Sequence, residues 1–412
     1  MALPNIAIIG AGPAGLTLAR LLQVHNIPCT VFEKDPTPSD RATNGGCLDL
    51  HVGSGQEAIK EAGLWDAYQK YARYSGQAYI ISDSTGREYL NIRDLDLGRP
   101  EIDRPHLRRM LLDSLRPGTV RWDHKLSSVD IVEGSSTATT TTTGPTLHFA
   151  GGRVESGFDL VVGADGAWSK VRERLCTVPP FYAGLCGYEM WITNDPDAAC
   201  PDVSALTGDG SHWAVGQDGR MLSLQRQTDR SIQIYALMRK HEAWHANSGI
   251  VDPTDPTEVK DVILREYADW APQFRRAIEA VDGAVIPRSL YMLHVGTRWR
   301  HKAGLTLIGD AAHLMTPFAG EGVNVAMHDA LLLARSIIAR PRDEVDAAAE
   351  EYERDMFPRA KVFQQATWDS LQARFDDDGN EKMAEGFKKV AEELKNGSYV
   401  NDGSRPDAVF TS

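Results

Sequence analysis

The chain has 412 residues, of which 42% are hydrophobic and 25% are charged, and its formal net charge is −13. This length predicts two or three domains with a large core. The negative charge argues against nucleic acid as a partner, because no basic face is available to neutralise phosphates. No apolar run reaches the ~18 residues of a membrane span, and the five cysteines include no C-x-x-C pair. We therefore expect a cytoplasmic protein with reduced thiols and without a signal peptide or membrane anchor.

The chain opens on a pattern of strand, helix and strand. Ile6–Ile9 is a short apolar run of the kind that forms a buried parallel strand. Leu16–Leu22 continues at helical spacing, and Cys29–Phe32 has the composition of a second strand. Together they predict a βαβ unit, the framework of a nucleotide-binding domain.

The first turn of this unit carries the motif G-x-G-x-x-G, formed by Gly10, Gly12 and Gly15. The first glycine lets the chain turn, the second lets the backbone approach a pyrophosphate, and the third lets helix and strand pack closely. The helix that follows directs its free N–H groups at the phosphates. Glu33 ends the second strand, about where a ribose-binding acid belongs. A glycine-rich turn without a ligand would not explain that acid, so we predict dinucleotide binding.

The middle of the first half is expected to alternate between short elements. The predicted segments are the loop Lys34–Asn44, a strand at Cys47–His51, a helix at Gly55–Tyr71, a hairpin of Ala78–Ser82 and Glu88–Ile92, a helix at Pro105–Leu115 and a strand at Val120–Trp122. Five consecutive threonines lie in Ser135–Gly144, which we interpret as a solvated hairpin tip without a function.

The pattern changes at Phe181 to strands of period two, which continue to Met238 and predict an antiparallel sheet. Turns are expected at Asp195–Ala198, Gly208–Gly210 and Gln217–Gly219. The predicted segments beyond it are helices at Pro256–Tyr267 and Phe274–Val281, strands at Val285–Leu293 and Leu305–Ile308, and helices at Val325–Ile338 and Glu344–Ala373. The tail from Asp376 is polar and interrupted by glycines.

Three apolar strands run into a turn that combines glycine with an acid or a further glycine. The opening unit is the first, Gly163–Gly166 follows the strand Phe158–Val162, and Gly309–His313 follows Leu305–Ile308. Open α/β sheets bind ligands at the carboxyl ends of their strands. Three such turns suit a long, bent cofactor better than a mononucleotide.

These three turns, in this order, resemble the class A flavoprotein monooxygenases of the aromatic-hydroxylase type. Within that group, the stretches Gly45–Leu64, Arg104–Leu115 and Gly309–Asn324 are most similar to the tetracycline-inactivating flavin monooxygenases. The resemblance extends from Ile6 to about Phe375.

The resemblance implies an α/β fold. It consists of a Rossmann-like FAD-binding domain of the GR2 and PHBH type, an inserted antiparallel-sheet substrate domain and a long C-terminal helix. The expected divisions are 1–72, 101–180 and 291–340 for the FAD-binding domain, 73–100 and 181–290 for the substrate domain, and 341–395 for a C-terminal helical segment.

The implied activity is that of an NAD(P)H- and FAD-dependent monooxygenase. It would use O₂, through a flavin C4a-hydroperoxide, to hydroxylate a polycyclic or phenolic compound, either a tetracycline-type molecule or a polyketide or other secondary-metabolite intermediate. We expect a monomer without a metal site. Two alternatives stay open, which are a protein that only binds flavin or an aromatic ligand, and a flavin halogenase, although the halogenase signature W-x-W-x-I-P is absent.

The resemblance also assigns cofactor residues. They are Gly10, Gly12, Ala14, Gly15, Glu33, Lys34, Arg41, Asp49, Arg104, Arg108, Asp165, Gly309, Asp310, Pro317, Gly320, Gly322, Val323 and Asn324. Asp310 is expected at the ribityl chain, Asp165 near the pyrophosphate and the nicotinamide approach, and Asp49 beside the isoalloxazine, unless it is a structural acid. Arg104 and Arg108 share a helix face and would face the cofactor, with a basic surface pair as the alternative.

Catalysis is attributed to the flavin, supported by Asp310, Pro317 and Gly320, so no catalytic side chain is assigned with certainty. The substrate candidates are Glu189, Trp213, Gln233, Tyr235, Phe318 and Gly320, with Tyr188, Met190 and Tyr291 as further pocket candidates. As single residues, such side chains are more often part of a core than of a pocket, by about two to one. If Glu189 faces inward, it should favour a hydroxyl or cationic amine and disfavour a carboxylate, so that simple benzoates are poor substrates.

Overall fold

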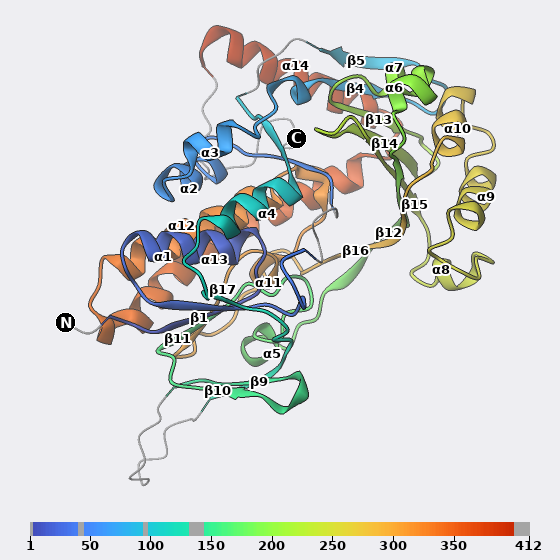
Figure 1. The fold of residues 1–412 in the computed structure, drawn as a ribbon. Coiled ribbons are helices and arrows are strands. Elements are labelled where there is room, and N and C mark those ends of the chain that lie inside the picture. The colour runs from blue at the N-terminus through green and yellow to red at the C-terminus, as the bar shows by residue number, and fades with distance from the viewer. Residues whose placement is uncertain (1–2, 40–44, 94–97, 132–143, 399–412) are drawn as a thin grey trace.

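The structure is a computed structural model that describes residues 3–39, 45–93, 98–131 and 144–398. A parallel sheet with covering helices forms one half of the molecule, and a second, larger sheet forms the other (Figure 1). The predicted α/β fold with an inserted sheet domain and a long C-terminal helix is confirmed. Within these residues no helix is long and apolar enough to cross a membrane. The threonine run at 139–143 lies outside the described residues.

The first half is built on a five-stranded parallel sheet. Its strands, in spatial order, are β17 (Leu305–Leu307), β11 (Leu160–Gly163), β1 (Ile6–Ile9), β2 (Cys29–Phe32) and β7 (Val120–Arg121). β1, β11 and β17 are neighbours, so their carboxyl ends and the three glycine-containing turns meet at one edge. A small antiparallel sheet of β8 (Leu126–Asp130), β9 (Thr146–Phe149) and β10 (Val154–Glu155) lies beside them.

Helices cover this sheet, whose strands β1, β11 and β17 are buried along their whole length. They are α1 (Pro13–Val24), α4 (Arg104–Asp113), α5 (Arg172–Leu175), α11 (Asp310–His313), α12 (Gly322–Ile338) and α13 (Val345–Ala373), with the short 3₁₀ helix η3 (Pro317–Ala319) before α12. The helix α12 packs between α1 and α13, and these elements share one hydrophobic core with the sheet.

The second sheet has seven strands. In spatial order they are β16 (Val285–Met292), β12 (Phe181–Ile192), β15 (Ile232–Arg239), β14 (Arg220–Arg226), β13 (Ser211–Val215), β4 (Tyr79–Ser82) and β5 (Glu88–Ile92). All neighbours are antiparallel except β13 and β4, which pair in parallel. The expected antiparallel sheet is therefore mixed at this one position, because β4 arrives from the first half of the chain.

The two faces of the second sheet differ in what they contact. One face packs on α8 (Trp244–Asn247), α9 (Pro256–Glu266) and α10 (Pro272–Glu279), which lie on the outer side of the sheet (Figure 1). The opposite face, called here the near face, is turned toward the cofactor half. Tyr188 and Met190 belong to the outer core, so their prediction as pocket residues was wrong. Strand alternation places neighbouring residues on opposite faces, and their side of β12 is the outer one.

Two local expectations were wrong near breaks that glycine and proline introduce. The single helix expected at Gly55–Tyr71 is two helices, α2 (Gly55–Glu61) and α3 (Trp65–Gln69). Gly63 between them has a φ of +69°, which ends the first helix. The turn expected at Asp195–Ala198 is instead the start of α6 (Pro196–Ala199), which leads into α7 (Pro201–Thr207).

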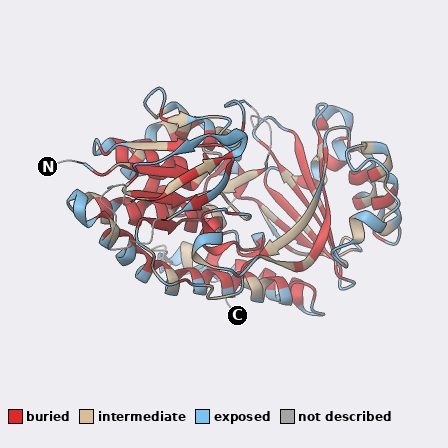
Figure 2. Cartoon of the chain, turned by 90° about the horizontal axis from the view of Figure 1, so that it is seen from below, coloured by how far each residue is buried: buried red, intermediate tan, exposed pale blue. Residues whose placement is uncertain are grey.

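The polar tail contains a helix that falls, but for its last residue, within the expected C-terminal helical segment 341–395. α14 (Gly379–Asn396) packs its apolar side on β4 and β5 at the edge of the second sheet (Figure 1). Met383, Phe387 and Val390 are buried there, and the Phe387 and Tyr79 ring centroids are 4.6 Å apart. In Figure 2 the buried positions run through both sheets, while exposed positions gather on loops and outer helix faces.

Candidate active site

The opening glycines have different surroundings. A Cβ at Gly10, whose φ is +108°, would lie 2.4 Å from the Ala164 carbonyl oxygen, and a Cβ at Gly15 would lie 2.1 Å from the Gly10 carbonyl oxygen. Both positions therefore require glycine so that backbone segments can approach. A Cβ at Gly12 would meet no atom within 4 Å. Gly12 thus borders open space at the N-terminus of α1, as a pyrophosphate site requires.

The turns after the three strands do come together. The backbone of Ala164 and Asp165 packs directly on Gly10, and a Cβ at Gly309 would lie 3.4 Å from that of Ala14. The Asp165 carboxylate accepts a hydrogen bond from the Lys170 backbone N–H at 2.7 Å, so it also closes its own turn.

Glu33 ties the end of β2 to the glycine loop. Its side chain is buried, and one oxygen accepts from the Ala11 N–H at 2.6 Å while the other accepts from the Asp35 N–H at 3.0 Å. Glu33 therefore lies beside the glycine loop, as the sequence pattern predicts. Lys34 next to it is exposed, and Arg41 lies outside the described residues.

The two arginines of α4 do not share a role. Arg108 is buried and donates to the Ala11 carbonyl at 3.2 Å, to the Pro38 carbonyl at 3.1 Å and to Asp35 at 3.2 Å. These bonds hold the glycine loop, and the expectation that Arg108 faces the cofactor stays a prediction. Arg104 is exposed and lies against Gly45.

Asp310 begins α11 at the shared edge. Asp310 has an exposed surface, but the surrounding protein partly removes its carboxyl from bulk water. This desolvation raises the pKa of Asp310, although His313, Arg104 and Arg172 oppose the shift. Arg172 donates to the Ala311 carbonyl at 3.0 Å and so fastens this turn. Sequence reasoning missed Arg172, although it lies only six residues after Gly166.

A buried ionic cluster fixes the position of Gly309, the residue before Asp310. Asp329 of α12 accepts from the Gly309 N–H at 2.9 Å, from His313 at 2.5 Å and from Arg359 of α13 at 3.0 Å. Burial opposes its charge, but His313 and Arg359 lower the pKa of Asp329 to about 2. The turn that presents Asp310 is therefore fixed by two helices.

The N-terminal end of α12 is joined to the short strand β3 (Cys47–Asp49). The Asn324 amide donates to the Asp49 carbonyl at 2.9 Å and accepts from the His51 N–H at 2.8 Å. Cβ atoms at Gly320, whose φ is +67°, and at Gly322 would meet nothing within 4 Å. Open space therefore lies before the free N–H groups of this helix, next to exposed Pro317 and half-buried Val323.

His51 forms an ionic chain under this junction. Its Nε2 lies 2.9 Å from Asp49 Oδ2, and its Nδ1 lies 3.2 Å from Glu321 Oε2. Burial alone would lower the pKa of His51, but the carboxylates of Glu321 and Asp49 raise it to about 10. Burial opposes the charge of Asp49 as well, yet His51 lowers the pKa of Asp49. His51 and Glu321 lie within the stretches Gly45–Leu64 and Gly309–Asn324, but the sequence analysis did not single them out.

A row of directly opposed residues crosses the near face. The row is formed by Trp213, Ser223, Tyr235, Glu189 and Ile286. Phe318 of η3 packs in one cluster with Trp213 and Tyr235. Arg374, which follows α13, lies 4.6 Å from the Trp213 ring centroid and 5.2 Å from that of Phe318, and burial lowers the pKa of Arg374 to about 9.

Glu189 faces this side but carries a compensated charge. It is fully buried, and one oxygen accepts from the Gln233 amide at 2.6 Å. The other oxygen accepts two hydrogen bonds from Arg288, one of them at 2.7 Å. Glu189 thus faces inward as the expectation required, but Arg288, of which the sequence pattern gave no sign, compensates the charge on which the expected repulsion of carboxylates rested. The poor turnover of simple benzoates stays a prediction. Tyr291 lies beside Trp168 and donates to Glu242, away from the row.

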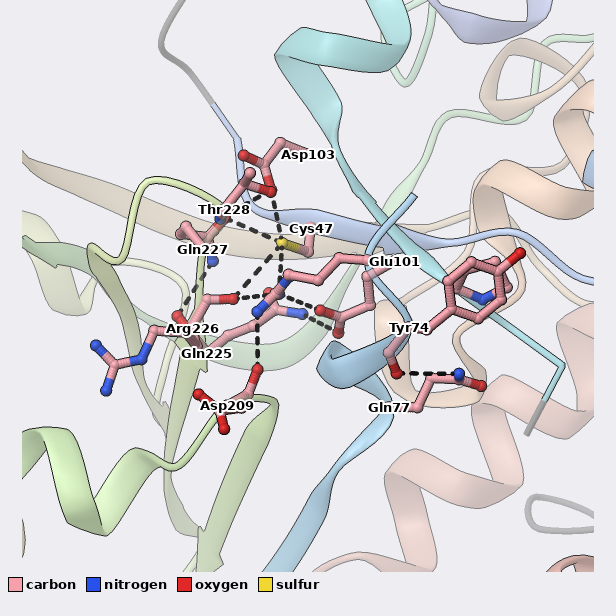
Figure 3. Close-up of polar contacts among 12 residues, drawn as sticks. Cys47, Tyr74, Gln77, Glu101, Asp103, Asp209, Gln225, Arg226, Gln227 and Thr228 are labelled. Carbon is pink, nitrogen blue, oxygen red and sulfur yellow. Dashed lines mark hydrogen bonds and ion pairs between the residues drawn. The ribbon is translucent and has the colours of Figure 1, made fainter. Parts of the chain in front are cut away.

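A polar cluster joins the two halves beside the site (Figure 3). Arg73 pairs with Glu101 of β6 (Glu101–Asp103) and donates to the Asp209 carbonyl at 2.7 Å. The hydroxyl of Thr228, after β14, donates to Asp103 at 2.9 Å, as does the Cys47 thiol at 3.0 Å. These bonds link β3 and β6 to the second sheet and set the position of the near face.

Comparison with known proteins identifies the family. The model described as FAD binding domain matches residues 4–367. Monooxygenase penA of Penicillium thymicola is 32% identical over 92% of this chain and 97% of its own length. The chain belongs to this family of FAD-dependent monooxygenases. FAD is its cofactor, and the open spaces at Gly12, Gly320 and Gly322 fit it.

Solved structures agree on the fold of this monooxygenase. HpxO of Klebsiella pneumoniae, in a complex with FAD and uric acid, has a TM-score of 0.76 at 20% identity and covers 98% of this chain and 97% of its own. The tetracycline destructase Tet(51) has a TM-score of 0.68 at 18% identity, with coverage of 97% and 98%. At these identities the likeness concerns the fold, so the membership in the flavin monooxygenases is shown and the resemblance to tetracycline-inactivating enzymes in particular is not.

Proposed function

We propose that this monooxygenase uses NAD(P)H and O₂ to hydroxylate a planar, oxygenated aromatic compound that binds between the N-terminal end of α12 and the near face. The observation that carries the proposal is the row from Trp213 to Glu189, which faces the cofactor half and packs with Phe318 beside the open space at Gly320. Aromatic walls with a few fixed polar groups are typical of pockets for ring compounds.

FAD, when bound and reduced, supplies the activation of O₂ and the transfer of one oxygen atom. The glycine loop would hold its pyrophosphate, with Glu33 beside the adenosine ribose and Asp310 within the reach expected for a ribityl hydroxyl. The free N–H groups of the first turn of α12 would stabilise negative charge at the ring edge that faces them. Asn324 keeps that turn in register with Asp49.

The near face would orient the substrate and exclude water. Trp213 and Tyr235 are half-buried and Phe318 is buried, so they offer apolar surface with little freedom to move. Arg104 and Arg374 place positive charge on the two sides of this region. An aromatic ring that carries an electron-rich oxygen substituent therefore suits the site better than a hydrocarbon.

The test is a panel of phenols and fused-ring compounds, with tetracycline and simple benzoates included, incubated with NADPH or NADH in air. We expect a yellow protein, oxidation of the nicotinamide that one compound stimulates, and a product heavier by one oxygen atom. A colourless protein that takes up no added FAD would contradict the proposal. A halogenated product formed when chloride is supplied, or tight binding without any product, would favour the alternative functions instead.

A further inference from the structure

We propose that Arg374 recognises an anionic oxygen of the substrate, so that this enzyme binds its aromatic compound as a phenolate, an enolate or a carboxylate. The inference deepens the proposed function and rests on it. It comes from a buried guanidinium that lies beside the near face and has no carboxylate partner among the residues that the structure describes.

The guanidinium of Arg374 lies at one end of the row of opposed residues on the near face. Its central carbon is 4.6 Å from the Trp213 ring centroid and 5.2 Å from that of Phe318. Trp213 is the end of the row on β13, and Phe318 lies two residues before Gly320, where the structure has open space. Both rings therefore border the proposed substrate region, and the charge next to them belongs to its wall.

Arg374 differs in its partners from other buried arginines. Arg108, Arg226 and Arg359 are also buried, and each has a carboxylate oxygen within 3.4 Å. Arg374 is 4% exposed, and no carboxylate of the described residues forms an ion pair with it. Burial lowers the pKa of Arg374, and within that part of the chain the group that opposes the shift is the Tyr79 hydroxyl rather than an acid side chain.

The hydrogen bonds of Arg374 leave part of its guanidinium free. A guanidinium has five N–H donors and no acceptor. Arg374 donates to the Phe318 carbonyl at 3.4 Å, to the Ser370 hydroxyl at 3.3 Å and to the Met383 thioether at 2.7 Å. All three acceptors are neutral, and a thioether is a weak one. Two of the five N–H groups thus have no acceptor among the described residues.

A buried cation without an anion is unfavourable. The two aromatic rings offset part of this cost, because a cation is attracted to the face of a ring. With a pKa of about 9, Arg374 still carries its charge at neutral pH. The Glu189 carboxylate in the row is bound by Arg288 and does not compensate this charge. An anionic oxygen on the substrate would supply the missing acceptor in a charge-assisted hydrogen bond.

A purely structural role of Arg374 is the alternative. Arg374 follows α13, and its bonds to Phe318 and Ser370 tie the end of that helix to η3. In that case the loss of the side chain would lower the stability of the protein and leave its choice of ligand unchanged. Stability and the preference for a charged ligand are therefore measured separately.

The experiment measures binding to the FAD-loaded protein without a nicotinamide cofactor, so it needs no turnover. The probes form two matched pairs, which are 4-nitrophenol with 4-nitroanisole, at a pH where the phenol is ionised, and 4-nitrobenzoate with its methyl ester. Calorimetric titration gives the dissociation constants. We expect wild-type protein to bind the anion of at least one pair about tenfold or more tightly than its neutral partner, as a charge-assisted hydrogen bond requires. The pair that shows the preference distinguishes a phenolate from a carboxylate group.

Two neutral variants remove the charge with side chains of different polarity. Arg374→Met and Arg374→Gln should each reduce the preference for the anion to about twofold or less. Arg239→Met is the matched control and should keep the preference. Arg239 is exposed, lies 4.7 Å from the Phe375 ring centroid and donates to the Gln372 carbonyl at 3.3 Å, so it is also an arginine stacked on a ring near the end of α13. Thermal unfolding and the flavin spectrum of each variant report whether it is folded and loaded.

The proposal is wrong if wild-type protein binds the two members of each pair within twofold of each other or binds none of the probes. It is also wrong if a folded, FAD-loaded Arg374→Met or Arg374→Gln retains the wild-type preference, or if Arg239→Met loses it to the same extent. These results do not depend on hydroxylation. Failure of the panel assay together with a clear preference for an anion would count against the proposed activity and leave the assignment of Arg374 standing.

Discussion

Within the glycine loop, some glycines are required for cofactor binding and others for the packing of the chain. A Cβ at Gly12 meets only open space, whereas a Cβ at Gly15 would collide with the Gly10 backbone. The same motif thus contains one position whose glycine serves a ligand and another whose glycine serves chain packing.

Gly12→Val should leave the apoprotein folded and abolish FAD binding, since the side chain would fill the space of the pyrophosphate. We expect the affinity to fall by at least about 100-fold, the upper range of a lost charge-assisted contact. Flavin absorbance after desalting and thermal unfolding of the apoprotein measure the two effects. Gly15→Ala is the comparison, and overpacking should lower its stability by about 1–3 kcal/mol. A yellow Gly12→Val protein would contradict the assignment.

The charge of His51 should make stability depend on pH. Its folded-state pKa of about 10 lies above the ordinary value of 6.5 through Glu321 and Asp49, while Arg99 opposes the shift. The stabilisation is therefore complete below pH 6.5 and is lost as the pH rises toward 10. Denaturant unfolding of the FAD-loaded protein should show a decline of at least about 1 kcal/mol over this window. In His51→Gln that decline should become shallower, and an unchanged slope would show that His51 is not the group responsible.

Among the elements, α14 stabilises the second sheet, a role that only the structure shows. It covers β4 and β5, which would otherwise form an exposed edge of the second sheet. Its buried side chains repeat at helical spacing, whereas its other face is charged.

Phe387→Ala should lower the free energy of unfolding by about 3–5 kcal/mol, the usual cost of deleting a buried aromatic ring. Phe387 is 5% exposed and packs on Tyr79, so the cavity would open at the edge of the second sheet. Lys389→Ala, an exposed change on the same helix, is the control and should stay within about 0.5 kcal/mol of wild type. Equal effects of the two changes would show that α14 is not docked as described.

At the scale of the whole molecule, the polar cluster of Figure 3 fixes one half against the other. Burial raises the pKa of Glu101 to about 8 although Arg73 opposes the shift. Arg73 therefore favours the charged form of Glu101 against burial, and without Arg73 the carboxyl would keep its proton to a higher pH.

Arg73→Met should make stability fall more steeply above about pH 8, because Glu101 without Arg73 keeps its proton there in the folded state, whereas the wild-type carboxyl is already ionised and its loss of stability has levelled off. Added to Arg73→Met, the change Glu101→Gln should remove that steep dependence. Unfolding by denaturant at several pH values measures both. A flat profile in Arg73→Met would mean that solvent reaches Glu101 and that the cluster does not couple the two halves.

Much of the cofactor half was determined by the sequence itself. A buried strand, a glycine turn and a helix are local patterns, and the carboxyl ends of neighbouring parallel strands must meet at one edge. The turns at Gly10, Gly163 and Gly309 could therefore be predicted to converge, and they do. The helix α14 also had a local signal, since Met383, Phe387 and Val390 recur at helical spacing.

Only the tertiary structure decided which partner each charged side chain has. Glu189 and Arg288 lie on strands β12 and β16, 99 residues apart, and nothing in their local patterns pairs them. Arg108 turns to the glycine loop and Arg104 does not, although both stand on one face of α4. Side chains on opposite faces of β12 likewise differ in role, as Tyr188 and Glu189 show. Periodicity fixes which residues share a face, whereas the partner of that face depends on long-range packing.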